Sequence, residues 1–175
     1  GTNATAGGAE GTDVTWIKGD SAGDLIVPAT LTTTVNSKTG VAIPGKSGGT
    51  NFPNSLLVGH ATTGTLNNAT GSTGVGLNAM DAITSANYVT CLGYNAGTMV
   101  TTGHSNTYLG FQSGYRTTTG YRNTALGRSP MTENLVGNDN VAIGYYSLYE
   151  SLGSNNVAVG KDTGRVITTG AYNIL

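Results

Sequence analysis

The segment Gly40-Val41-Ala42-Ile43-Pro44-Gly45-Lys46-Ser47 matches the G-x-x-x-x-G-K-S string that holds nucleotide phosphates. In that chemistry, backbone N–H groups and the lysine bind the phosphates between a buried strand and a helix that begins at the lysine. Here residues 32–38 are polar, and the following Ser-Gly-Gly-Thr-Asn-Phe-Pro run does not favour a helix. Gly74–Ala79 resembles a dinucleotide fingerprint but has no βαβ unit around it. We therefore predict no nucleotide site and no cofactor.

The residues that bind metals or act as nucleophiles are few and scattered. His60 and His104 have no cysteine or carboxylate at metal-ligand spacing. Cys91 is the only cysteine, and no base accompanies it, so it is expected to be a small packing residue. We predict neither a metal centre nor a catalytic nucleophile.

Carboxylates are the remaining candidates for catalysis, and tyrosines are the candidates for recognition. Asp81, Glu133, Asp139, Glu150 and Asp162 stand at scattered positions, and the sequence singles out no pair for glycan cleavage. The chain is therefore expected not to be an enzyme. Flat rings and hydroxyl groups suit sugar binding, and the candidates for surface recognition are Tyr115, Tyr121, Tyr145, Tyr146 and Tyr149. The alternative is that these rings stack on one another or fill a seam between chains.

The composition excludes several classes of protein. Only 10% of the 175 residues are charged and the net charge is −1, which argues against nucleic acid as a partner. With 37% hydrophobic residues and little net charge, the chain does not have the usual disordered composition. No run of about 18 apolar residues exists, so no membrane insertion is expected in this segment.

A repeat of 17 residues organises the chain from about residue 54 onward. An aliphatic residue followed by glycine recurs with spacings of 17, and once 16, and these glycines are predicted corners: Gly59, Gly76, Gly93, Gly110, Gly127, Gly144 and Gly160. Three residues before each glycine stands a residue that is β-branched in six of seven repeats, which predicts a short strand. The aliphatic residues before the glycines are predicted to form the inward core: Val58, Val75, Leu92, Leu109, Leu126, Ile143 and Val159.

Short strands of this kind cannot bury themselves, but stacked coils share a continuous core. The sequence predicts an all-β fold, a β-solenoid or parallel β-roll of about seven coils over 54–175, stopping in mid-repeat. Residues 1–53 lack the repeat and are expected to form an irregular β connector.

A narrow coil buries little surface, which favours association of several chains. The residue between the two strand positions is small at Cys91, Ala125, Ala142 and Ala158, and it is expected to face outward, toward another chain or toward solvent.

Asn123-Thr-Ala-Leu-Gly127 and Asn140-Val-Ala-Ile-Gly-Tyr-Tyr-Ser147 resemble the head repeats of YadA-like trimeric autotransporter adhesins. The 17-residue form with Thr-Thr-Gly is more similar to repeats of phage tail fibres, many of which end in an endosialidase-type chaperone that is not present here. The resemblance covers roughly 54–175. It implies a left-handed β-roll in a parallel, intertwined homotrimer.

The resemblance also implies a function. It predicts a structural, fibrous segment of a phage tail fibre or other virion appendage that mediates host attachment, with a cell-surface glycan or protein receptor as the partner. The alternative is a bacterial trimeric surface adhesin, extracellular on the cell surface, and a third class is a glycan depolymerase. The expected location is the virion.

Overall fold

The computed structural model describes residues 18–19, 25–26, 45–47, 51–59 and 63–175. The chain divides into two compact units, Gly1–Thr34 and Val35–Leu175. In the first unit, β1 (Lys18–Gly19) and β2 (Leu25–Ile26) form an antiparallel pair. The expected boundary after residue 53 lies inside the second unit, and most of the expected connector lies outside the described residues.

The second unit contains one sheet of eight short strands in the order β10 to β3. Its strands are β3 (Gly45–Ser47), β4 (Leu56–Val58), β5 (Thr73–Val75), β6 (Thr90–Leu92), β7 (Thr107–Leu109), β8 (Thr124–Leu126), β9 (Val141–Ile143) and β10 (Val157–Val159). From β4 to β10 every pairing is parallel, and each residue pairs with its counterpart one repeat later, as Thr107 does with Thr124.

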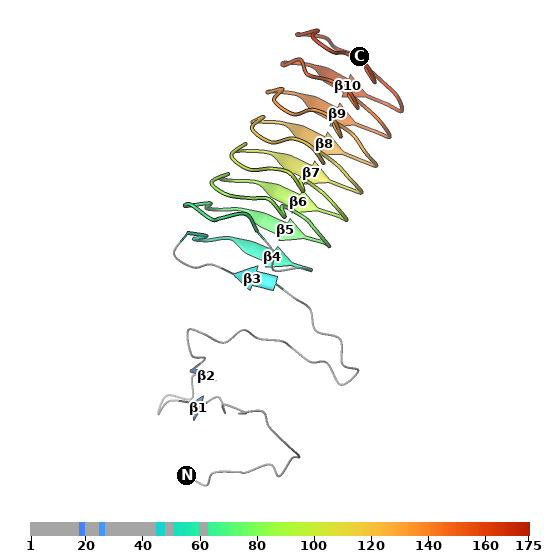
Figure 1. Cartoon of the computed structure of the whole chain (residues 1–175). Helices are drawn as coiled ribbons and strands as arrows, with labels where there is room; N and C mark the ends of the chain where they lie inside the picture. Colours follow the sequence, from blue (N-terminus) through green and yellow to red (C-terminus); the bar gives the residue numbers. More distant parts are fainter. Residues whose placement is uncertain (1–17, 20–24, 27–44, 48–50, 60–62) are drawn as a thin grey trace. The chain divides into compact units, whose positions relative to one another are not determined.

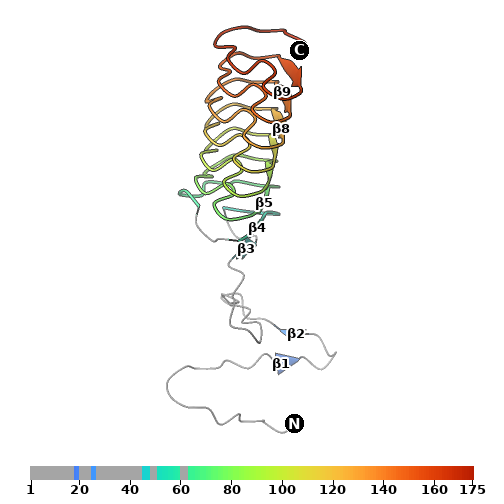
Figure 2. The same cartoon turned by 90° about the vertical axis from the view of Figure 1, so that its right-hand side faces the viewer.

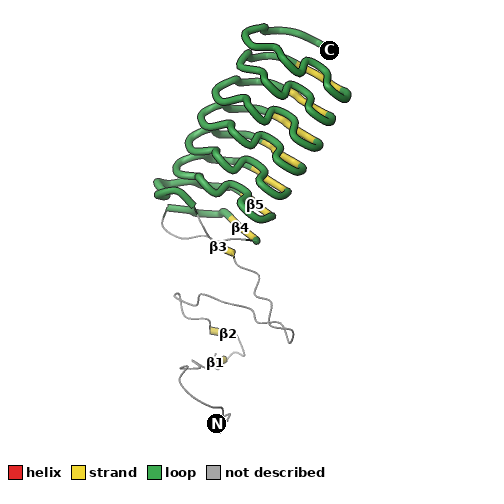
Figure 3. The backbone as a smooth tube through the Cα atoms, turned by 45° about the vertical axis from the view of Figure 1, so that its right-hand side comes forward, coloured by secondary structure: helices red, strands yellow, loops and turns green. Residues whose placement is uncertain are grey.

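The repeat therefore sets the fold. Each repeat makes one coil, and the coils stack along one axis from β4 to β10 (Figures 1 and 2). The strands form a single ladder along the stack, and the remainder of each coil is turn and loop (Figure 3). An all-β parallel β-solenoid of about six turns is confirmed, and no helix occurs among the described residues.

The glycine after each strand permits both the turn and the close approach of successive coils. Gly127 has a φ of 129°, a value that residues with a side chain rarely adopt. A Cβ on Gly127 would lie 2.9 Å from the carbonyl oxygen of Gly144 in the next coil. Below, positions in a coil are counted from this corner glycine, and residues at one position in successive coils form a column.

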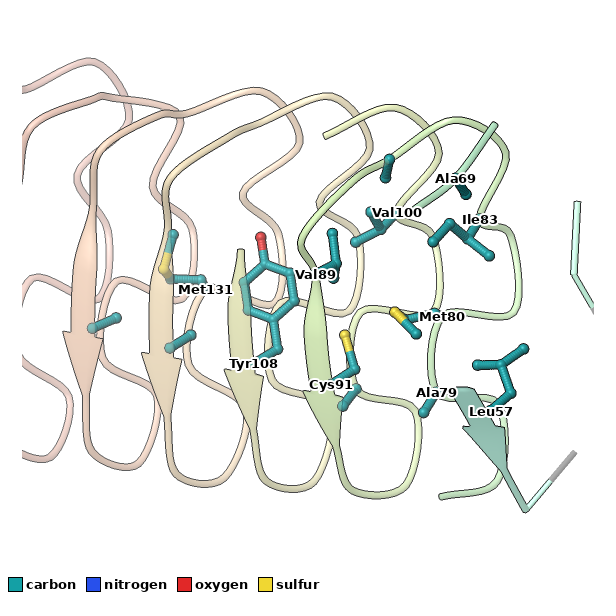
Figure 4. Packing of buried hydrophobic residues seen from close by; sticks show 14 of the residues in the cluster. Leu57, Ala69, Ala79, Met80, Ile83, Val89, Cys91, Val100, Tyr108 and Met131 are labelled. Carbon is teal, nitrogen blue, oxygen red and sulfur yellow. The ribbon is translucent and has the colours of Figure 1, made fainter. Parts of the chain in front are cut away.

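The face of the strand that points inward is the opposite of the one predicted. The middle strand residues are buried, as for Leu57, Cys91, Tyr108 and Ala125 (Figure 4). The predicted inward core lies on the outer face instead. Its members are exposed or half-buried: Val58, Val75, Leu92, Leu109, Leu126, Ile143 and Val159.

The physical reason is the width of the coil. The strand faces a turn of its own coil, so the space between them suits Ala, Gly or Cys better than a row of Leu and Val. The small middle residues therefore pack inside the coil, and the expectation that they face outward is also wrong.

In several coils the interior is filled by a large residue that faces a small one. The residue four positions after the corner is Met131 where the middle strand residue is Ala125, and Leu148 where it is Ala142. Tyr108 reverses the order, because glycine stands four positions after its corner. A Cβ on Gly114 would lie 2.5 Å from the Tyr108 ring. Large and small residues are thus matched in these coils, as close-packed interiors favour, whereas both positions are small at Cys91 and Gly97 and at Ala158 and Gly164.

A ladder of buried asparagines joins the later coils. The side chain of Asn123 accepts a hydrogen bond from the N–H of Asn140 (3.0 Å) and donates one to the carbonyl of Gly137 (2.8 Å). The same two bonds recur at Asn106, Asn140 and Asn156. Backbone groups that the turns leave unpaired are satisfied in this way inside the stack.

Three residues of the phosphate-binding string lie in a strand. Gly45, Lys46 and Ser47 make up β3, which pairs antiparallel with β4, so no helix begins at Lys46. The preceding residues 40–44 lie outside the described residues.

Candidate functional site

The cysteine and the described histidine do not form a reactive centre. Cys91 is buried in the coil interior, and burial raises the pKa of its thiol, which disfavours the nucleophilic thiolate. The His104 ring stacks on Tyr121 with ring centroids 5.1 Å apart. His60 lies outside the described residues, and within the described ranges no three His, Cys, Asp or Glu residues gather as metal ligands.

Two of the five candidate carboxylates come together. Glu133 and Glu150 each stand six positions after a corner glycine, and both line one groove. Arg116, in the same column one coil earlier, binds Glu133 with an Nη1–Oε2 distance of 2.7 Å. Asp139 and Asp162 lie elsewhere, in ion pairs with Arg122 and with Arg165 and Lys161.

We call this depression the Tyr149 groove. It has a volume of about 430 Å³, within the range of roughly 300–1,000 Å³ that is usual for small-ligand sites. The charged column forms one wall, and residues eight positions after the corner form the other. Its lining residues are Arg116, Glu133, Leu135, Tyr149, Glu150 and Leu152, with Thr168 in the last coil.

Tyr149 is fixed in place by aromatic and cationic neighbours. Its ring meets Tyr146 edge to face at 4.9 Å, and the Arg165 guanidinium lies 5.7 Å from its centroid. Partial burial raises the pKa of the Tyr149 hydroxyl, and the charge of Glu133 acts in the same direction. The hydroxyl therefore stays protonated at neutral pH, available as a hydrogen-bond donor.

The other candidate tyrosines divide between two clusters. Tyr145 stacks on Tyr146 at 4.0 Å, and Arg128 lies over both Tyr145 and Phe111, so one cluster of rings and guanidinium groups reaches Tyr149. Tyr121 belongs to a separate stack with His104 and Arg122. Tyr115 is half-buried, and no ring contact of its side chain is seen in the described part. Ring-on-ring stacking thus accounts for most of the candidates, as the alternative reading proposed.

The groove was not predicted, although the spacing of its lining residues in the repeat indicates it. Glu133 and Glu150 are 17 residues apart, so they share a column and are not at scattered positions. Leu135 and Leu152 were not considered at all. They interrupt a column that is Asn67 in the first coil and threonine at Thr84, Thr101, Thr118 and Thr168, and this interruption is visible in the repeat.

Comparisons with known proteins add no identity. No family model, no curated protein and no solved structure matches this chain. In the part of the chain that the structure describes, no helix has the length and apolarity needed to span a bilayer.

Proposed function

We propose that the chain is a structural, fibrous segment of a phage tail fibre or other virion appendage that acts in host attachment. The observation that supports this most is a stack of coils with one shared backbone, in which each coil is hydrogen-bonded to the next through strand and turn, and the later coils also through the asparagine ladder. Such a stack makes a rod whose outer columns vary without changing the backbone. A bacterial trimeric surface adhesin is the alternative and uses the same rod.

The proposal includes assembly into a parallel homotrimer. The outer face of the strands carries a row of aliphatic side chains one coil apart, with Leu109 38%, Leu126 40% and Val159 57% exposed. A row of this kind that runs along a rod is costly in water, and three copies related by a threefold axis would cover it. The face turned toward the partner chains is therefore the one that the sequence analysis placed inside.

The assembly is tested with Leu126→Asp. If the strand face is the seam, the aspartate converts the trimer into monomers that keep a folded coil, because Leu126 lies outside the coil. Val136→Asp is the matched control, because Val136 is 54% exposed and stands elsewhere in its coil. Sedimentation velocity and thermal unfolding measure the two effects. A monomeric wild-type chain, or a Leu126→Asp variant that remains a trimer, would contradict the proposed seam.

The sequences that flank this segment in its gene distinguish a phage fibre from a bacterial adhesin. A virion-attachment domain on one side supports the phage fibre, located on the virion. A secretion signal together with a C-terminal membrane barrel supports the adhesin on the bacterial cell surface.

The proposal treats the segment as non-enzymatic. Polysaccharide cleavage that disappears in both Glu133→Gln and Glu150→Gln would overturn this part and favour a glycan depolymerase.

A further inference from the structure

We propose that the Tyr149 groove binds a neutral glycan that lies along the axis of the rod. This inference rests on the attachment role proposed above and assigns that role a site and a ligand class. It begins from an inversion of polarity in the coils that form the groove.

The buried column seven positions after the corner is apolar in the earlier coils, at Leu66, Ile83 and Val100. In three of the four coils that line the groove it is polar, at Thr117, Asn134 and Ser151, whereas Ile167 in the fourth coil is apolar. Asn134 and Ser151 each have a buried polar atom without a hydrogen-bond partner among the described residues, and the Thr117 hydroxyl lies near the equally buried hydroxyl of Tyr108. An interior of this kind lowers stability and is not what packing alone would select.

The neighbouring outer column changes in the opposite sense. Thr84, Thr101 and Thr118 each donate a side-chain hydrogen bond to a backbone carbonyl of the next coil, at 2.9 to 3.1 Å. Leu135 and Leu152 replace this column in the groove, and Leu152 is 45% exposed. At these two positions the side-chain hydrogen bond that threonine makes in other coils is absent, and apolar surface is exposed to water instead. The buried column is thus more polar, and the neighbouring outer column more apolar, than stability alone would favour. Such departures favour a function at this wall of the groove.

The groove offers the groups that a sugar chain needs. Leu135 and Leu152 supply an apolar strip for the C–H faces of sugar rings, and the fixed ring of Tyr149 extends it. Carboxylates accept hydrogen bonds from sugar hydroxyls, whereas the Arg116 guanidinium, Thr168 and Tyr149 hydroxyls donate to them. Hydrogen-bond donors and acceptors are therefore both present in the groove, as a neutral polyhydroxyl ligand requires.

Charge selects the ligand class. Arg116 is already paired with Glu133, and Glu150 has no ion pair in the described part, so the groove carries one net negative charge. Acidic glycans are repelled by such a groove. The groove offers a basic peptide only one carboxylate without an ion pair. The cationic side chains of such a peptide would not match the hydroxyl groups and the leucine strip.

The dimensions suit a polymer. The lining residues come from four successive coils, which spans roughly 14 Å at about 4.8 Å per coil. A chain of repeating sugar units along this axis would meet side chains of the charged column and of the leucine strip in successive coils. The groove lies five to eight positions after the corner, roughly halfway round the coil from the strand, so a trimer joined by its strand faces leaves it open.

Binding is tested by calorimetry of the purified chain with a panel of purified bacterial polysaccharides that have neutral or acidic repeating units. At least one neutral polysaccharide should bind, and none of the acidic ones should bind more tightly. Leu135→Thr/Leu152→Thr should weaken binding at least tenfold while leaving the melting temperature unchanged, because threonine restores the ladder of the neighbouring coils. Glu150→Gln, which keeps the shape and removes one acceptor charge, should weaken binding severalfold.

Leu77→Thr is the matched control, because it makes the same exchange at an exposed leucine outside the groove. It should leave binding unchanged. The inference is overturned if no neutral polysaccharide binds, if acidic ones bind more tightly, if the leucine variants bind normally, or if only a protein receptor free of glycan is bound. Sedimentation of the same samples separates the two proposals: a trimeric rod without glycan binding overturns the groove alone, and a monomer that binds glycan overturns the assembly alone.

Discussion

The coils of residues 55–100 and those of residues 106–173 share one backbone but are held together differently. In the earlier coils, Ser55, Ser72 and Val89 occupy the column that precedes the strand, and apolar Ile83 and Val100 lie behind it. In the later coils the same column is asparagine throughout, and the column behind it is polar from Thr117 to Ser151. Apolar packing dominates the first region, and hydrogen bonds dominate the second.

The earlier and later coils also differ at a second glycine position. Three residues before each ladder asparagine stands a glycine, as at Gly120 and Gly137, whereas alanine holds this place at Ala69 and Ala86. A Cβ on Gly120 would lie 2.5 Å from the carbonyl oxygen of Gly137 and 3.2 Å from the side-chain nitrogen of Asn123, so both the next coil and the ladder asparagine require glycine there. These glycines are required for space, in contrast to the corner glycines, which also have positive φ. A polar ladder therefore needs two coordinated changes for each coil.

The largest effect is expected from breaking the polar ladder. Asn123→Ala leaves the N–H of Asn140 and the carbonyl of Gly137 buried without partners. Because each orphaned group costs about 1–3 kcal/mol, unfolding free energy should fall by about 2–6 kcal/mol, measured by urea denaturation.

Ser72→Ala is the comparison in the earlier coils. It leaves the N–H of Val89 without its partner at 3.2 Å and removes two longer hydrogen bonds, of 3.4 Å each, to the carbonyls of Thr70 and Ala86. The expected loss is about 1–3 kcal/mol, and an equal or larger loss than in Asn123→Ala would contradict the contrast between the two regions.

The next effect concerns Tyr108, the buried residue at the boundary between the earlier and the later coils. Tyr108→Ala should cost about 3 kcal/mol, the lower end of the range for deleting a buried aromatic side chain, because its unpartnered hydroxyl is removed with it. Adding Gly114→Met should recover part of this loss. Met131 holds the equivalent place beside Ala125 at a φ of 51°, so methionine is compatible with the backbone there.

Thermal and urea unfolding of the single and double variants test this exchange. Gly114→Met alone should destabilise the chain, because the new side chain collides with the Tyr108 ring. The two substitutions are thus expected to be strongly non-additive. Additive losses would show that the two positions do not share one space.

A smaller effect, of opposite sign, is expected from making the later interior resemble the earlier one. Ser151→Ala removes a buried hydroxyl that has no partner among the described residues, so stability should rise by about 1 kcal/mol. Val100→Ser, in the same column of an earlier coil, should destabilise. A loss of stability in Ser151→Ala would mean that the hydroxyl is hydrogen-bonded, for example to a buried water.

The sequence predicted the fold because the 17-residue repeat dictates the ladder. Once Leu109 and Leu126 occupy equivalent places, parallel pairing in register follows, and the glycine corners follow from the same spacing. The inward face was predicted wrongly because, in a strand of three residues, the alternation of side chains allows either the middle residue or the two outer residues to point into the coil. Only the width of the coil, which depends on how Ala125 meets Met131 across it, decides between the two.

The site could be read only in part. The shared column of Glu133 and Glu150 and the break in the threonine ladder at Leu135 are visible once residues are aligned by coil. The depth of the groove and the contact of Tyr149 with Tyr146 depend on side-chain directions in turns, where Tyr146 and other residues adopt positive φ. Turn geometry of this kind does not follow from a hydrophobic pattern.

The smallest effect is expected from the ion pair between two later coils. Arg122 donates two hydrogen bonds to Asp139, at 2.6 and 2.9 Å, and holds the pKa of that carboxyl below its ordinary value of 3.8. Because the folded-state pKa is lowered, the pair stabilises the fold above pH 3.8, and this contribution is lost as the pH falls through the lowered value. Arg122→Gln should return the pKa toward 3.8 and leave stability at neutral pH nearly unchanged, since the pair is exposed. Carboxyl chemical shifts followed through an acid titration measure this, and an Asp139 pKa that does not rise in the variant would show that Arg122 is not the cause.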